Sequence, residues 1–127
     1  MVRQAAGLEP VPWEDALALV AERAAGEAWL LLGSAARAVR GADVDPRDID
    51  LVTETAAACD AIAHALADVL IEPLGDGGWL AQRWFRAFAG ARIECAGAPH
   101  DAALAEYDET VVWRGHALRL SRARRPA

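Results

Sequence analysis

The segment that most constrains the fold of this chain is DIDLVT, residues 48–53, in which two aspartates alternate with apolar residues. Alternation with a period of two predicts a β-strand, because successive side chains of a strand point to opposite faces of the sheet. Ile49 and Leu51 then pack on one face, while Asp48 and Asp50 share the other. Burying an unpaired carboxylate is costly, so these aspartates should face solvent or hold a cation together. The segment therefore predicts a sheet with one covered face and one open face.

The flanking segments predict an α/β or α+β domain with a mixed sheet of about four to six strands and helices packed on one face. Helical spacing of apolar residues predicts helices over 13–25 and 55–70, and SAARAVRG favours a short helix. AWLLLG suits a buried strand, and EPLGDGG suits a turn or loop. The remaining expectations are two strands reversing near 89–91, a short helix within 100–107, and a hairpin turning at 114–116.

Length and composition favour a single domain over residues 1–127 whose basic end, about 119–127, is a disordered tail. Hydrophobic residues make up 54% of the chain, but no apolar run approaches the roughly 18 to 20 residues that span a bilayer. The first residues, MVRQAAGLEPVPWEDAL, lack the apolar stretch of a signal peptide. We expect a cytoplasmic protein that does not enter a membrane.

The two cysteines and the net charge limit which kinds of site and binding partner are expected. Cys59 and Cys95 form no CxxC pair and have no histidine at a ligand spacing, so buried free thiols are expected. The net charge of −6 makes nucleic acid an unlikely partner, because binding it requires many phosphates to be neutralised. Small molecules or proteins are the favoured partners.

A candidate phosphate-binding turn precedes the acidic strand. Gly33 and Ser34 stand where an apolar strand turns into a helix, and such small residues let backbone N–H groups and a hydroxyl approach a phosphate. Arg37 and Arg40, one helical turn apart, are candidates to reach the same anion. A tight turn with a helix cap is the simpler interpretation of Gly33 and Ser34, and it is compatible with phosphate binding. Walker-type and GxGxxG motifs are absent from the sequence.

Asp48 and Asp50 suit Mg²⁺, which accepts one or two carboxylates and takes its other ligands from water and phosphates. A two-ion site needs a third carboxylate on a neighbouring strand. ARIECAGA supplies Glu94, which points outward with Arg92 while its apolar neighbours point inward. The alternatives are a solvated strand face for the two aspartates, and for Glu94 a surface ion pair with Arg92 or Arg83.

The segment LLLGSAARAVRGADVDPRDIDLV resembles the signature of the polymerase-β-type nucleotidyltransferase superfamily, and is also similar to the head domain of tRNA CCA-adding nucleotidyltransferases. The resemblance covers roughly residues 29–97. It implies a nucleotidyltransferase-like mixed sheet in which a Gly-Ser turn holds the nucleotide triphosphate and three acidic residues bind Mg²⁺. Carried over, the turn is Gly33 and Ser34, and the acidic residues are Asp48, Asp50 and Glu94.

This resemblance implies Mg²⁺-dependent transfer of NMP from an NTP, with ATP the expected donor, to a hydroxyl of a small molecule or a partner protein. The size suits antibiotic-modifying enzymes and the minimal nucleotidyltransferases paired with HEPN-type proteins. The chain has no helical acceptor-binding region, so a second copy in a homodimer or a HEPN-type partner would complete the acceptor pocket. The alternative is a non-catalytic binding module, such as the antitoxin of a toxin–antitoxin pair.

Overall fold

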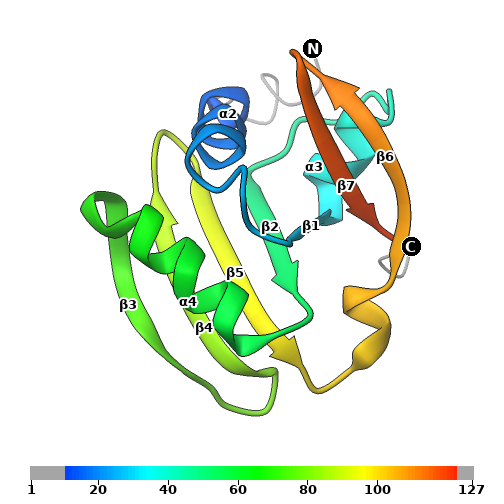
Figure 1. Ribbon diagram of the computed structural model, residues 1–127. Helices are drawn as coiled ribbons and strands as arrows, with labels where there is room; N and C mark the ends of the chain where they lie inside the picture. The colour runs from blue at the N-terminus through cyan, green and yellow to red at the C-terminus, as the bar shows by residue number, and fades with distance from the viewer. Residues whose placement is uncertain (1–10, 123–127) are drawn as a thin grey trace, which may run out of the picture.

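The computed structural model describes residues 11–122, and within that range a seven-stranded sheet and three α-helices form the framework (Figure 1). The α-helices are α2 (Trp13–Arg23), α3 (Gly33–Val39) and α4 (Ala56–Ala65). The strands are β1 (Leu30–Leu32), β2 (Asp48–Thr53), β3 (Leu70–Gly77), β4 (Ala81–Phe88), β5 (Arg92–Pro99), β6 (Tyr107–Trp113) and β7 (His116–Ser121). Two short 3₁₀ helices, η1 (Ala67–Val69) and η2 (Ala102–Ala105), complete the set.

The sheet is mixed, with the strand order β3-β4-β5-β2-β1-β7-β6. Strand β2 runs parallel to β5, and β1 runs parallel to β7, whereas the other neighbours are antiparallel. The predicted α+β architecture with a mixed sheet is therefore confirmed. The sheet has seven strands rather than the four to six expected.

One face of the sheet carries the core, and α2 and α4 lie across it (Figure 1). Leu17 of α2 and Ile62 of α4 pack with the inward side chains of the central strands, and all are fully buried. Those inward side chains include Ile49, Leu51, Phe85, Ile93 and Cys95. The alternation of β2 therefore places Ile49 and Leu51 in the core, as the period-two pattern predicts, but it ends at Val52, which is buried on the face that carries the aspartates. Cys59 and Cys95 are buried free thiols, as expected.

The segment after β2 departs from the prediction at its far end. Thr55 caps α4 by accepting a hydrogen bond from the backbone N–H of Ala58, but the helix ends at Ala65 instead of continuing to residue 70. The prediction of a loop over EPLGDGG is wrong for residues 72–77, which belong to β3, and only Gly78 lies in the turn that follows. The glycines and the proline of this segment led to the loop prediction, because both residue types favour turns. They are tolerated in β3 because this strand lies at the edge of the sheet and pairs irregularly with β4.

The two predicted reversals are confirmed. The β4–β5 turn closes with a hydrogen bond from Ala89 to Ala91, and the β6–β7 turn contains Arg114 and Gly115 in the left-handed region. Residues 119–121 of the predicted tail instead form the end of β7, whose Leu120 is buried in the core, while residues 123–127 lie outside the described range. The helix expected within 100–107 is the single 3₁₀ turn η2. Between residues 11 and 122, no helix combines the length and apolarity needed to cross a bilayer.

Candidate metal and nucleotide site

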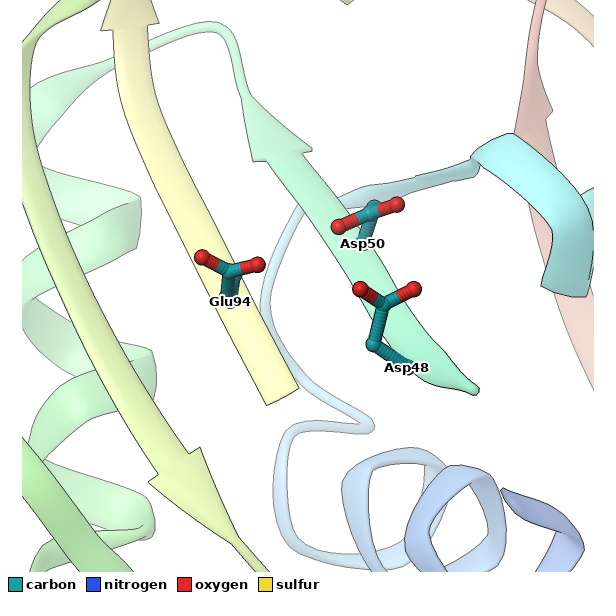
Figure 2. A group of neighbouring side chains, drawn as sticks. All are labelled: Asp48, Asp50 and Glu94. Atoms are coloured by element: carbon teal, nitrogen blue, oxygen red, sulfur yellow. The ribbon is translucent and has the colours of Figure 1, made fainter. Parts of the chain in front are cut away.

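The parallel pairing of β2 with β5 brings the three predicted carboxylates together. Asp50 lies opposite Glu94 in the register, and Asp48 lies one step along the same face. Each of the three offers an oxygen, and these oxygens all lie within 4.8 Å of one another. Figure 2 shows the carboxylates of Asp48, Asp50 and Glu94 gathered on the same side of the two strands. The structure thus assembles the acidic group from segments more than forty residues apart in the sequence.

The chemistry of this acidic group fits a divalent cation. Three carboxylates supply the oxygen ligands that Mg²⁺ prefers, and all three side chains are half-buried, which leaves room for water or phosphate oxygens as further ligands. Among residues 11–122, no second group of three or more acidic, histidine or cysteine side chains converges in this way. The residues present therefore suit the ion that the sequence resemblance implies.

Gly33 closes one side of the site. Its φ is +74°, a conformation that favours glycine, and a Cβ built on it would lie 2.7 Å from Oδ2 of Asp50. Leu32 pairs with Asp50 across β1 and β2, so the turn that follows β1 lies directly against this aspartate. A side chain at position 33 would displace the carboxylate. The sequence indicated the turn, but the contact with Asp50 depends on strand pairing that only the fold supplies.

The other predicted phosphate contacts follow this turn along α3. Ser34 is half-buried in the first turn, and Arg37 is exposed in the last turn. Ser34 and Arg37 thus lie on the helix that begins beside Asp50.

Arg40 has a different environment. Its guanidinium forms ion pairs with Asp108 and Glu109 of β6, at 2.7 and 2.9 Å, and donates to the backbone carbonyl of Ser121. Desolvation alone would lower the pKa of Arg40, but the hydrogen bonds to Glu109 and Asp108 raise it above its usual value. These contacts join the end of α3 to the C-terminal hairpin. A phosphate would have to compete with two carboxylates for Arg40, so its role in nucleotide binding stays a prediction.

Two arginines border the acidic group. Arg92 approaches Asp48 at 3.5 Å, and Arg86 of β4 donates from Nη2 to Oε1 of Glu94 at 3.0 Å. The alternative interpretation of Glu94 was an ion pair with Arg92 or Arg83. The ion pair exists but its partner is Arg86, because Arg92 approaches Asp48 and Arg83 pairs with Asp60 of α4. The hydrogen bond to Glu94 raises the pKa of Arg86, so its guanidinium remains charged.

A sequence signal for Arg86 did exist. The β4–β5 hairpin turns around Gly90, so residues equally distant from it pair, and Arg86 lies opposite Glu94 in the register. The side chains of directly paired residues share one face of the sheet. Register counting from the predicted turn would therefore have identified the arginine, whereas proximity in sequence favoured Arg92.

The fold is similar to that of a solved protein from Thermotoga maritima described as a "putative nucleotidyltransferase". The TM-score is 0.70 and the sequence identity is 17%, with 84% of this chain and 74% of that chain covered. No protein-family model and no curated protein matches the sequence. At this identity the likeness concerns the fold alone, and the chain has a nucleotidyltransferase-like fold.

Proposed function

We propose that this protein is a Mg²⁺-dependent nucleotidyltransferase that moves NMP from an NTP, with ATP the expected donor, to a hydroxyl group. The acceptor is a small molecule or a partner protein. The observation that carries the proposal is the convergence of Asp48, Asp50 and Glu94 on the open face, against the Gly33 turn. The nucleotidyltransferase-like fold supports the same reaction class.

In this proposal the three carboxylates hold the cation, and the sheet fixes their spacing because β2 and β5 are hydrogen-bonded neighbours. Bound Mg²⁺ would neutralise charge on the triphosphate and orient it for in-line displacement. The acceptor oxygen forms a bond to the α-phosphorus while the bond to the bridging oxygen breaks, and pyrophosphate leaves. A carboxylate oxygen of the group accepts the proton of the attacking hydroxyl.

The Gly33–Ser34 turn supplies the phosphate contacts in the proposed reaction. Its lack of a side chain at position 33 lets the turn approach the metal-binding carboxylates, and the Ser34 hydroxyl and nearby backbone N–H groups are donors for phosphate oxygens. Arg37, exposed on the same helix, adds a positive charge beside the nucleotide. Each of these residues binds and orients the triphosphate without reacting.

The test is calorimetric titration with a non-hydrolysable ATP analogue, with and without Mg²⁺. Wild type is compared with the double variant Asp48→Ala/Asp50→Ala and with Asp60→Asn, a control that removes one carboxylate paired to Arg83 away from the site. We expect metal-dependent binding in wild type and the control and none in the double variant. Binding that survives the double substitution would contradict the proposal. Absence of binding in all three would favour the non-catalytic binding module.

A further inference from the structure

A row of charged side chains runs across four neighbouring strands, β3, β4, β5 and β2, and ends at the proposed metal site. In the strand register Glu72 of β3 lies opposite Arg86 of β4, and Arg86 lies opposite Glu94 of β5. Glu94 in turn lies opposite Asp50 of β2. One positive charge therefore lies between an outer carboxylate and the acidic group. The row joins the edge of the sheet to its centre through side chains on a single face.

Arg86 is held firmly in this row. Its Nη1 atom donates to Glu72, its Nη2 atom donates to Glu94, and its Cζ atom lies 5.1 Å from the ring centroid of Trp84. The Arg86 Nε atom is buried and has no hydrogen-bond partner among residues 11–122. The side chains of Arg86 and Glu94 are only 26% and 24% exposed, so water screens their interaction less than that of a surface pair. The guanidinium is a fixed charge beside the third carboxylate.

A bound cation and Arg86 would compete for the negative charge of the Glu94 carboxylate. Arg86 is stabilised by the negative charge of this carboxylate, and a cation held by Asp48, Asp50 and Glu94 would draw on the same charge. Two positive charges a few ångströms apart also repel each other. Binding of the ion must therefore weaken or rearrange the Arg86–Glu94 contact.

We propose that Arg86 is a built-in counter-ion of the third carboxylate, which holds Glu94 in the metal-free protein and sets how tightly the acidic group binds a divalent cation. The inference rests on the proposed metal site. Glu72 moderates the effect, because it attracts the opposite end of the same guanidinium. Arg86 is thus a positioning residue that acts through Glu94 and does not itself touch the ion.

The experiment measures the dissociation constant of Mn²⁺ alone, used as a spectroscopic substitute for Mg²⁺, for Arg86→Met and Arg83→Met. Arg83 lies on the same strand and also forms an ion pair, so Arg83→Met matches the change in net charge without touching the acidic group. We expect Arg86→Met to bind Mn²⁺ about threefold to tenfold more tightly than Arg83→Met. Equal or weaker binding by Arg86→Met would overturn the inference.

Two further variants separate a charge effect from a packing effect. Arg86→Lys keeps the charge and should bind Mn²⁺ with nearly wild-type affinity. Glu72→Gln removes one of the two carboxylates that attract Arg86, so that Arg86 interacts with Glu94 alone. This variant should bind Mn²⁺ about twofold to threefold more weakly than wild type, whereas the matched Asp60→Asn should bind Mn²⁺ like wild type. If Arg86→Met does not fold, the comparison of Glu72→Gln with Asp60→Asn decides the question. Weaker Mn²⁺ binding by Glu72→Gln supports the inference, and equal or tighter binding refutes it.

Failure of this inference differs from failure of the proposed function. If wild type and Arg83→Met bind Mn²⁺ and Asp50→Asn does not, the metal site stands whatever Arg86→Met does. If no variant binds Mn²⁺, including Arg86→Met, the metal site fails and the inference fails with it. The rise in melting temperature on adding Mn²⁺ gives a second readout, because ligand binding stabilises the folded state, and it should be larger in Arg86→Met than in Arg83→Met.

Discussion

The two faces of the β2–β5 pair are made from alternate residues of the same strands, yet they have opposite chemistry. On the covered face Ile49 and Ile93 are 0% exposed, and on the open face Asp50 and Glu94 are half-buried carboxylates. A shift of one residue in either strand would exchange the two faces and bury the carboxylates in the core. The core therefore fixes the register that assembles the proposed site, and stability and function can be perturbed separately on adjacent residues.

The largest expected effect is on the covered face. Replacing Ile49 with alanine should lower the free energy of unfolding by about 2–5 kcal/mol, because it leaves a cavity beneath α2 and α4. Urea unfolding measures the loss, and Mn²⁺ titration of the remaining folded protein should give nearly the wild-type affinity. A large change in metal affinity without loss of stability would show that the two faces are not separable in this way.

The neighbouring residue on the open face should give the opposite result. Asp50→Asn is expected to reduce the proposed nucleotidyl transfer roughly 100-fold or more, because it removes a carboxylate from the proposed metal site. The free energy of unfolding should stay unchanged or rise slightly, since three nearby carboxylates repel one another without a cation. Activity assays and urea unfolding of one preparation test both parts, and retained transfer by a folded variant would contradict the mechanism.

Gly33 is expected to link the two kinds of effect. Gly33→Ala should cost about 1–2 kcal/mol of stability from backbone strain and also weaken Mn²⁺ binding several-fold, because the added Cβ displaces the Asp50 carboxylate. Gly115→Ala is the control: its φ of +81° imposes similar strain, but nothing lies within 4 Å of its Cβ. If both variants bind Mn²⁺ equally well, the Gly33–Asp50 contact has no role in the site.

The smallest effects concern the two arginines of α3, which test how far the open-face site extends. Arg37→Met should weaken binding of the ATP analogue about threefold without changing stability, because its side chain is exposed. Arg40→Met should lower the melting temperature slightly, since it removes the ion pairs to β6, with little effect on nucleotide binding. A reversal of these two results in the same titration would place Arg40, rather than Arg37, beside the nucleotide.

Local patterns in the sequence determined much of this protein. The period-two alternation of residues 48–51 indicates a strand with one apolar and one acidic face, and Thr55 marks the start of α4 through its capping hydroxyl. The turns near Gly90 and Gly115 identify two hairpins. These features depend on steric preferences and hydrogen bonds within a few residues, so a single chain displays them without any knowledge of its partners in space.

Tertiary structure decided what depends on pairing between distant segments. Residues 72–77 form part of a strand because they pair with β4, and this pairing outweighs the local preference of glycine and proline for turns. Arg86 contacts Glu94 because the β4–β5 register places the two residues opposite each other. Arg40 contacts β6 because the C-terminal hairpin returns to pair with β1. The contact of Gly33 with Asp50 likewise arises from the β1–β2 pairing. The sequence alone indicated the three carboxylates of the candidate site, and long-range strand pairing determined their neighbours, because electrostatic partners are set by distance in space and not along the chain.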